Sequence, residues 1–353
     1  MPPSTTPATL ARQVLAAEAD AIRAIPLDDD TFNQATQLIA DRCTHKAAGA
    51  GGSLVVSGLG KSGLIAQKLA ATFASTGTPA HFLHPAEAMH GDLGRVRSHD
   101  TVLLLSYSGN TDELVNLASI LKQDNVPTIA IVGPQNSDLQ RLANLTLHVG
   151  DITEACPNNL APTASTTAML ALGDALALAV SQQLAFSPED FHKVHPGGGL
   201  GRQLMPVAEA MRFRTGPDGN LPLIPESTTL ADAFAAATEA ATRTGVRRAG
   251  ALLAIHSDGT LAGIFTDGDL RRLLAHPPNT TTNPSSATSI LNTPLANILT
   301  RNPTTLNHTQ TVRDAVRIMR ELRIDEIPVL DNHNKPLGMI DVQDLVALKV
   351  IQG

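Results

Sequence analysis

Short runs of apolar residues alternate along the first half of the chain with longer stretches in which apolar residues recur every three or four positions. The short runs predict buried strands, and the periodic stretches predict amphipathic helices. Strands are expected at Ser53–Ser57, Ala80–Leu83, Thr101–Leu105, Thr128–Val132 and Leu145–Val149. Helices are expected at Leu10–Ala48, Ser62–Ser75, Asp112–Lys122 and Ser165–Leu184. This alternation predicts an α/β fold with a doubly wound parallel sheet.

The pattern changes after Gly199, and the remaining chain contains an internal repeat. Segment Gly259–Leu270 is similar to Lys335–Leu345. Each copy is preceded by a predicted helix and a predicted strand, which are Thr229–Thr244 with Ala251–Ile255, and Thr311–Leu322 with Glu326–Leu330. The turn-rich segment Pro277–Ser289 is expected to link the copies. Two copies of about 60 residues are too few for a solenoid, so a paired module is predicted.

Charge and composition exclude several classes of partner. The 353 residues carry a formal net charge of −7 and contain no basic run, which argues against nucleic acid and anionic membranes as partners. The N-terminus lacks the pattern of a signal peptide, and no window approaches about 18 uninterrupted apolar residues. Cys43 and Cys156 are the only cysteines and have no metal-ligand spacing. Two reduced thiols and a cytoplasmic location are therefore expected.

Segment Gly58–Gly63 follows a predicted strand and opens a predicted helix, where free amides and the helix dipole favour anions. It matches G-x-G-x-x-G, but a dinucleotide site also needs an acid at the end of the second strand, and His81–His84 contains none. A P-loop would need glycine where Val55 stands. Lys61 suits a compact phosphate or a developing oxyanion, and the alternative is a tight turn with a solvated lysine.

Two further polar segments stand before predicted helices. Ser106–Thr111 offers several hydroxyls and backbone donors, and Pro162–Thr167 precedes the long alanine-rich helix. Three such helix starts exceed what turn chemistry requires. Together they predict one phosphate gripped by several neutral donors, as expected for a monophosphorylated sugar, with Gly60, Ser62, Ser106, Ser108, Thr111, Ser165 and Thr166 as candidate contacts.

These motifs resemble those of a known family. The order of the three polar segments resembles a flavodoxin-like sugar isomerase (SIS) domain, and the repeat resembles a tandem pair of cystathionine-β-synthase (CBS) domains. With the added segments Phe73–Pro79, His90–Gly94, Glu154–Pro157 and His195–Gly198, the chain is similar to the arabinose 5-phosphate isomerase family. The resemblance implies an N-terminal helical segment (1–40), a SIS domain (41–204) and two CBS domains (205–278 and 290–353).

The resemblance also implies the activity and the site residues. The expected reaction interconverts D-ribulose 5-phosphate and D-arabinose 5-phosphate on the way to 3-deoxy-D-manno-octulosonate (KDO), for lipopolysaccharide or capsule. No cofactor is required, and a homo-oligomer, with four copies expected, is implied. The catalytic residues that it implies are Lys61, Glu113, Glu154 and His195, and further substrate contacts are Gly77, Thr78, His84 and His90. His84 is also implied as a site for inhibitory zinc. One departure is Asn110, where the family often has Glu.

The chemistry suggests a role for each implied residue. Glu154 is expected to move the proton between C1 and C2, and His195 to shuttle hydroxyl protons. Lys61 would lie near the phosphate or the enediolate, with Glu113 holding Lys61 or a hydroxyl in place. Judged alone, Glu113 is better explained as a solvated first-turn acid that favours its helix dipole, and Glu154 could equally be a structural loop residue. Two alternative functions stay open: a sugar-phosphate sensor without activity, and an isomerase for another sugar phosphate.

The repeat contains a candidate nucleotide site. Gly263–Asp269 fits the G-x-x-[ST]-x-x-D pattern of CBS modules, in which Thr266 would meet phosphate and Asp269 the ribose. The second copy has Asp341 where Thr or Ser is expected, and an acid there repels phosphate. A nucleotide or CMP-KDO is the expected effector, and the alternative is a packing and oligomerisation module.

Overall fold

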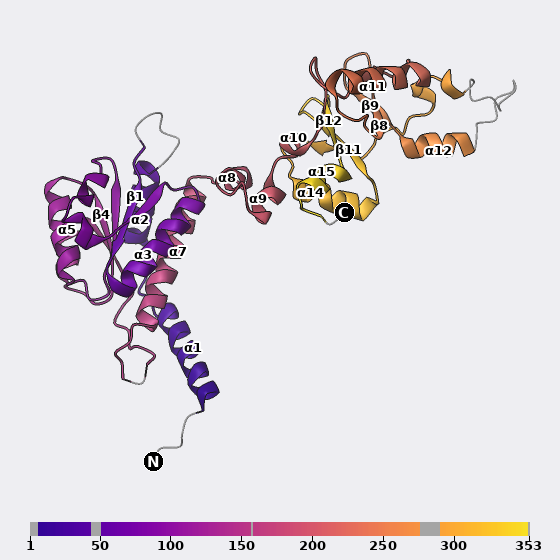
Figure 1. The fold of residues 1–353 in the computed structure, drawn as a ribbon. Coiled ribbons are helices and arrows are strands. Elements are labelled where there is room, and N and C mark those ends of the chain that lie inside the picture. The colour runs from indigo at the N-terminus through magenta and orange to yellow at the C-terminus, as the bar shows by residue number, and fades with distance from the viewer. Residues whose placement is uncertain (1–5, 44–50, 157, 276–289, 352–353) are drawn as a thin grey trace. The chain divides into compact units, whose positions relative to one another are not determined.

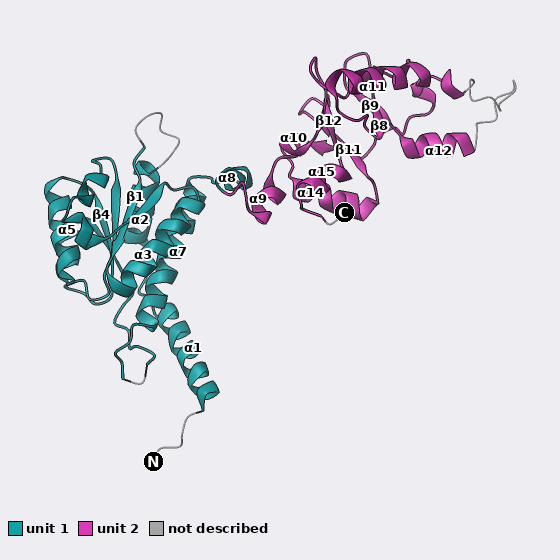
Figure 2. Ribbon diagram, in the orientation of Figure 1, with its two compact units in different colours: residues 1–194 teal, residues 195–353 magenta. Residues whose placement is uncertain are grey.

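The computed structural model describes residues 6–43, 51–156, 158–275 and 290–351. The chain divides into two compact units, residues 1–194 and 195–353, which Figure 2 shows in two colours. Each unit is described by itself. The predicted linker Pro277–Ser289 and the end of the predicted helix Leu10–Ala48 lie outside the described residues. The predicted domain boundary at residue 204 stays a prediction.

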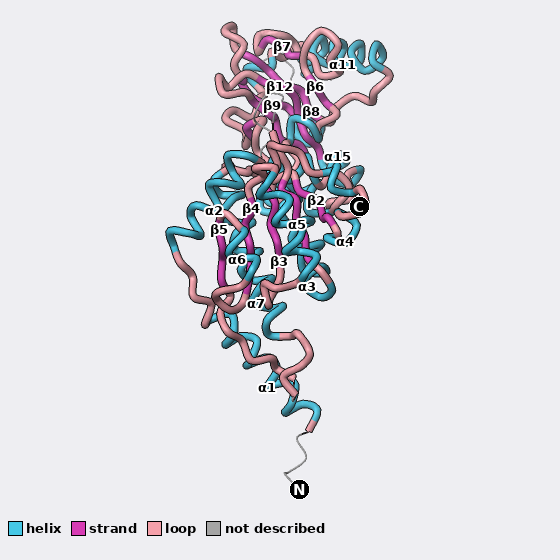
Figure 3. Tube along the Cα trace, turned by 90° about the vertical axis from the view of Figure 1, so that its left-hand side faces the viewer, coloured by secondary structure: helices cyan, strands magenta, loops and turns pink. Residues whose placement is uncertain are grey.

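Unit 1 contains a five-stranded parallel sheet in the order β2-β1-β3-β4-β5 (Figures 1 and 3). Each strand forms at the apolar run that predicted it, because the runs are buried on both faces of the sheet. The strands are β1 (Leu54–Gly58), β2 (Ala80–Leu83), β3 (Thr101–Leu105), β4 (Thr128–Val132) and β5 (Leu145–His148). The order and direction confirm the predicted doubly wound fold.

Helices cover both faces of this sheet. The elements are α1 (Pro7–Arg23), α2 (Asp29–Arg42), α3 (Gly60–Ser75), α4 (Pro85–Ala88), η1 (Asp92–Arg95), α5 (Asp112–Gln123), α6 (Asp138–Leu142), α7 (Ala164–Gln183) and α8 (Pro188–Val194). One buried core joins α2, α3 and α7 to Leu54 and Val56 of β1. The other joins α4, α5 and α6 to Val55, which points to the opposite face of the same strand.

The prediction of one continuous helix over Leu10–Ala48 was wrong, because the structure has two helices there. Helix α1 ends at Arg23 and α2 begins at Asp29. Pro26 lies between them and disfavours helical backbone at the residue before it. Asp28 caps α2, since its carboxylate accepts from the backbone N–H of Thr31 at 3.2 Å.

Helix α7 is, within the described ranges, the single helix whose length and composition would allow it to cross a membrane. Half of its apolar window is buried inside unit 1, where it contacts α1, α2 and α3. Core helices meet the same compositional test, so this is weak evidence for a membrane span.

Unit 2 has the order strand, helix, strand, strand, helix twice, as the repeat predicted. It begins with α9 (Gly199–Leu204) and α10 (Val207–Ala210). The first copy contains β6 (Phe213–Arg214), β7 (Leu223–Pro225), α11 (Leu230–Thr244), β8 (Ala251–Ile255), β9 (Leu261–Thr266) and α12 (Asp267–Ala275). The second contains η2 (Leu295–Asn297), β10 (Leu306–Asn307), α14 (Val312–Leu322), β11 (Glu326–Leu330), β12 (Pro336–Asp341) and α15 (Val342–Ala347).

The strand registers show which positions of the two copies correspond. Thr266 pairs with Ala251 at the end of β9, and Asp341 pairs with Glu326 at the end of β12. Thr266 and Asp341 are therefore equivalent positions, each directly before the final helix of its copy.

Candidate active site

The first two polar loops begin side by side at the carboxyl edge of the sheet. Strand order reverses between β1, whose connection leads to β2, and β3, whose connection leads to β4. Gly58 at the end of β1 is in register with Leu105 at the end of β3. Ligands of doubly wound folds bind at such a switch point. The cavity of about 300 Å³ in unit 1 lies beside β5 and the start of α2, and its lining includes none of the predicted site residues.

Each glycine of the first loop, Gly58–Gly63, is required for its own structural reason. Gly60 has a φ of +60°, a conformation that side chains with a Cβ rarely adopt. Gly58 and Gly63 approach each other closely, since a Cβ on Gly63 would lie 2.7 Å from the carbonyl oxygen of Gly58. The loop thus turns directly into α3 and leaves the first amides of the helix at the switch point.

The start of α3 carries a positive charge that no described acid neutralises. Its N-cap residue Leu59 supplies no side-chain hydrogen bond, and its first turn contains no acid. Lys61 is exposed, and no acidic group within the described residues, the expected partner Glu113 included, lies within ion-pair distance of it. A cation is unfavourable at a helix N-terminus, so this end of α3 favours an anionic ligand.

The hydroxyls of the second loop are used largely within the loop. The Ser106 hydroxyl lies 2.9 Å from the Thr111 hydroxyl and accepts from the Gly109 N–H at 3.1 Å. The Ser108 hydroxyl accepts from the Asn110 N–H at 3.3 Å. Asn110, the departure from the family pattern, accepts from the Asp138 N–H at 2.9 Å. These bonds shape the loop, and substrate contact by its hydroxyls stays a prediction.

Glu154 occupies the start of α7. Its carboxylate accepts from the Thr163 N–H at 2.7 Å, the Thr163 hydroxyl at 3.1 Å and the Ser165 N–H at 3.3 Å. Burial raises the pKa of Glu154, but the hydrogen bonds from Ser165 and Thr163 outweigh it and hold the pKa below its ordinary value. The hydroxyl of Thr166 donates to the Thr163 carbonyl at 2.9 Å. A carboxylate therefore already fills this helix start, which leaves α3 as the better place for a phosphate.

Helices α3 and α7 run in the same direction, so their starts lie at the same edge of the sheet (Figure 1). A Cβ on Gly173 would lie 2.3 Å from the Leu69 side chain. Just beyond the ends of both helices, a Cβ on Gly77 would lie 2.4 Å from the Phe186 ring. The contact that lies beyond the end of α3 also lies beyond the end of α7, so the two helices are parallel and in contact. Lys61 and Glu154 therefore lie at neighbouring helix starts.

Sequence reasoning did not single out Tyr107, which joins the second loop to the segment that carries Glu154. Its hydroxyl donates to the Ile152 carbonyl at 3.1 Å and accepts from the Ile152 N–H at 2.7 Å. Tyr107 is the only tyrosine in the chain. That singularity is the one signal in the sequence that could have drawn attention to it.

The structure does not bring the remaining site residues that the resemblance implies together at one place in unit 1. His84 follows β2 beside the first loop, and its Nδ1 is buried without a hydrogen-bond partner among the described residues. His90 is exposed beyond α4. Gly77 and Thr78 precede β2 at the amino edge, opposite Lys61 in the same chain. His195 begins unit 2, and the site of unit 1 is described without it. These assignments stay predictions, as does zinc at His84; no group of three metal-ligand side chains occurs in the part of the chain that the structure describes.

Two family models match parts of the chain, and curated relatives match most of its length. The SIS domain model matches residues 49–179, and the CBS domain model matches 295–350. Arabinose 5-phosphate isomerase KpsF of Escherichia coli is 37% identical over 344 residues, 95% of this chain and 94% of the relative. The chain belongs to the arabinose 5-phosphate isomerase family. KdsD of Pseudomonas aeruginosa is 38% identical, over 93% of this chain and 96% of its own.

Solved structures agree with this family. A protein of Escherichia coli CFT073 in complex with arabinose 5-phosphate is 36% identical, with a TM-score of 0.50 over 55% of this chain and 100% of that chain. A putative phosphosugar isomerase involved in capsule formation from Bacteroides fragilis is 39% identical, with a TM-score of 0.50 over 53% and 96%. The expected enzyme class, aldose–ketose isomerase, is confirmed by the curated relatives.

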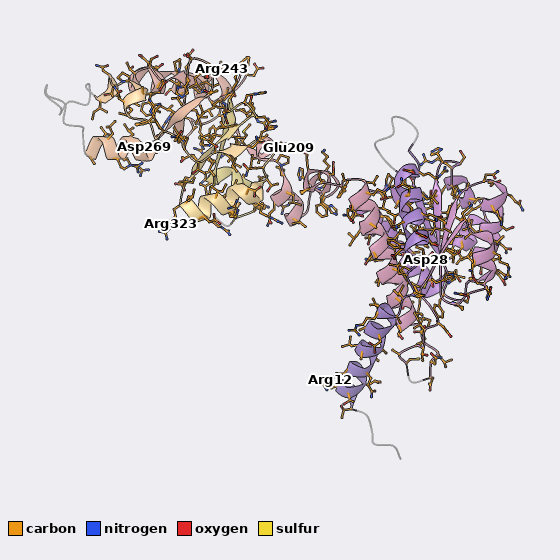
Figure 4. The ribbon with its side chains drawn as sticks, turned by 180° about the vertical axis from the view of Figure 1, so that it is seen from behind. Arg12, Asp28, Glu209, Arg243, Asp269 and Arg323 are labelled. Carbon is orange, nitrogen blue, oxygen red and sulfur yellow. The ribbon has the colours of Figure 1, made fainter. Side chains whose placement is uncertain are left out.

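In unit 2 of this isomerase, a cavity of about 500 Å³ contains the first candidate nucleotide site. Asp269 accepts from the N–H and the hydroxyl of Thr266, both at 2.8 Å, and pairs with Arg272. Burial raises the pKa of Asp269, but the bonds from Thr266 and Arg272 hold it below its ordinary value. The cavity also contains Arg323, which Figure 4 labels together with Asp269. Thr266 and Asp269 thus line one cavity, and nucleotide binding there stays a prediction.

At the equivalent positions of the second copy, Asp341 and Asp344 are paired with arginines of the same chain. Arg212 bonds to Asp344 and lies 3.3 Å from Asp341, which also pairs with Arg247. Asp341 and Asp344 are both buried. The two carboxylates of the second copy are therefore engaged by two guanidinium groups, and the expectation that this copy does not hold a nucleotide stays a prediction.

Proposed function

We propose that this chain interconverts D-ribulose 5-phosphate and D-arabinose 5-phosphate through an enediolate, without a cofactor. The observation that carries the proposal is Lys61, without an ion-pair partner among the described residues, at the uncapped start of α3 and beside a helix start that holds Glu154. The phosphate would bind the α3 amides and Lys61, and the first carbons of the sugar would extend toward Glu154. A related structure contains arabinose 5-phosphate, which supports the same substrate.

In the proposed reaction, ionised Glu154 takes a proton from C1 of the ketose and returns it to C2. The carbonyl oxygen becomes an enediolate oxygen in between, and the cation and the oriented donors stabilise it. His195 moves protons between the two oxygens. The product would supply KDO synthesis in the cytoplasm, and a similar solved structure, a putative phosphosugar isomerase involved in capsule formation, supports a link to capsule formation.

A coupled assay with ribulose 5-phosphate tests the proposal against its alternatives. Turnover of ribulose 5-phosphate above that of hexulose phosphates supports it. Binding without turnover would indicate a sensor, and faster turnover of another sugar phosphate would indicate a different isomerase.

We also propose a homo-oligomer, with four copies expected, in which His195 acts in a neighbouring chain. Exposed leucines on α1, α3 and α7 support association: Leu15, Leu64 and Leu178 are 67%, 63% and 60% exposed. Gly77 and Thr78 could contact a sugar held at Lys61 only in another copy, because they lie at the opposite edge of their own sheet.

Mixing two inactive variants tests action across chains. When His195→Ala and Lys61→Met chains are refolded together, half of the sites in each hybrid regain both groups, so that random pairing restores about a quarter of the wild-type activity. Each variant refolded alone is the control. If the mixture stays as inactive as its components, His195 does not act across chains.

The cavity at Thr266 and Asp269 is proposed to bind a nucleotide or CMP-KDO as an effector. Calorimetry with AMP, ATP and CMP-KDO should show binding, and Asp269→Asn should weaken it about 10-fold, because a charged hydrogen bond to a sugar hydroxyl is lost. Asp344→Asn, at the equivalent position of the second copy, should lower stability and leave the affinity unchanged. Absence of heat with all three ligands would favour a packing and oligomerisation module.

A further inference from the structure

Tyr107 connects the two parts of the proposed site. The residue belongs to the loop after β3, whereas Ile152 belongs to the segment between β5 and α7 that carries Glu154. One hydroxyl satisfies both backbone groups of Ile152, donating at 3.1 Å and accepting at 2.7 Å. Removing the hydroxyl would leave a half-buried N–H and a half-buried carbonyl without their partner.

The position of the Tyr107 ring is itself fixed. Gly133 follows β4, and a Cβ there would lie 2.4 Å from the ring, so glycine gives the ring its place. The Gly133 N–H donates to the Tyr107 carbonyl at 2.8 Å. Burial, then Asp151 and Glu154, raise the pKa of the phenol above its ordinary value, although its bond to Ile152 opposes this, so the hydroxyl keeps its proton.

The segment after β5 is held at both ends. At its far end, Glu154 bonds to Thr163 and Ser165 at the start of α7. At its near end, Tyr107 holds Ile152, two residues before Glu154. Between Glu154 and Thr163 the segment bonds to itself, for example from the Glu154 N–H to Asn159 at 2.6 Å.

We infer that Tyr107 is a positioning residue, whose hydroxyl holds the Glu154 carboxylate beside the substrate by fixing Ile152 to the loop after β3. The inference rests on the proposed function, because it assigns Glu154 the proton transfer. A base that is misplaced by even an ångström transfers a proton far more slowly, while the binding of a phosphate at α3 is hardly affected.

The test is Tyr107→Phe, which keeps the ring and removes only the hydroxyl. We expect kcat to fall about 10- to 100-fold with KM changed less than about threefold, because substrate binding is left intact and base placement is lost. Hydrogen exchange of amides 150–156 should become faster, while exchange in the strands stays unchanged. A merely structural role would lower stability without this local change in exchange.

Thr128→Val is the matched control. The Thr128 hydroxyl likewise donates to one group and accepts from another of a single residue, Asn144, at 3.2 and 3.3 Å. It is buried at the amino edge of the sheet, away from the site. Its loss should lower stability and leave kcat unchanged. If Tyr107→Phe keeps kcat as Thr128→Val does, and exchange of 150–156 is unaltered, the inference is overturned.

The chain offers a second readout that needs no turnover. It contains no tryptophan and Tyr107 is its one tyrosine, so tyrosine fluorescence, excited where phenylalanine does not absorb, reports on this residue alone. Arabinose 5-phosphate should change that emission, because its sugar would lie between the two parts that Tyr107 joins. If the wild type binds the sugar phosphate without turnover, the isomerase proposal fails. Hydrogen exchange and fluorescence then still decide whether Tyr107 holds the segment. Unchanged exchange of amides 150–156 in Tyr107→Phe, together with unchanged tyrosine emission on adding the sugar phosphate, would refute the role of Tyr107.

Discussion

Glu154→Gln is expected to lower kcat about 10²- to 10⁴-fold, the usual contribution of a positioned general base. The amide has almost the same size as the carboxylate, and its oxygen can still accept from the Thr163 and Ser165 amides that cap α7. The variant should therefore fold and keep a KM near that of the wild type. Steady-state kinetics with ribulose 5-phosphate measure both quantities, and wild-type turnover would remove Glu154 from the reaction.

The same residue predicts a pH dependence. Hydrogen bonds lower the pKa of Glu154 in the folded chain, so the base stays ionised below the pH at which an ordinary glutamate titrates. Turnover and this contribution to stability should persist above pH 4.5 and be lost as pH falls through the lower folded pKa. Asp151→Asn, an exposed acid in the same segment, is the control and should leave kinetics unchanged.

Lys61→Met is expected to lower kcat/KM about 10²- to 10³-fold, because it removes the cation from the start of α3, where the phosphate and the enediolate are proposed to bind. The methionine keeps a long apolar side chain and favours helix, and the lysine has no ion pair to lose within the described part of unit 1. Stability should consequently stay the same or rise slightly, since a cation at a helix start is unfavourable.

Lys68→Met supplies the matched control on the same helix. Lys68 pairs with Asp174 of α7 at 2.5 Å and is about half exposed, so its loss should change stability little and activity not at all. Thermal unfolding and kcat/KM of both variants separate the two effects. Equal kinetics for Lys61→Met and the wild type would mean that α3 does not hold the phosphate.

Much of unit 1 could be predicted because its signals are local. Apolar runs such as Thr101–Leu105 are buried on both faces, and that alone identifies them as strands of a covered parallel sheet. The glycines of Gly58–Gly63 report a turn that needs positive φ and close packing, and the structure contains both. The parallel direction then places the ends of β1 and β3 together, so the two loops could be expected at one edge.

The use of the polar side chains could not be predicted from their residue types. The hydroxyl-rich Pro162–Thr167 suggested a further phosphate contact, but Glu154 takes the N–H groups of Thr163 and Ser165. Likewise, Tyr107 and Ile152 are 45 positions apart, and no local pattern joins them. Such pairings depend on how a segment without regular structure folds back on the sheet.

In unit 2 the sequence showed that an acid replaces a hydroxyl residue at one position of the second copy, but only the structure showed which residues pair with that acid. Asp341 at the place of Thr266 indicated that the second copy would not hold a phosphate. The sequence did not show that Arg212 and Arg247 would pair with Asp341, because they lie 129 and 94 positions before it. Two carboxylates buried together require such cations, or they would lose their charge.

The most direct test of the account is a crystal structure of this chain with arabinose 5-phosphate bound. The account predicts the phosphate at the first amides of α3 and within hydrogen-bond distance of the Lys61 Nζ, with C1 and C2 of the sugar beside the Glu154 carboxylate. A phosphate bound away from α3, or a sugar whose first carbons lie out of reach of Glu154, would contradict it.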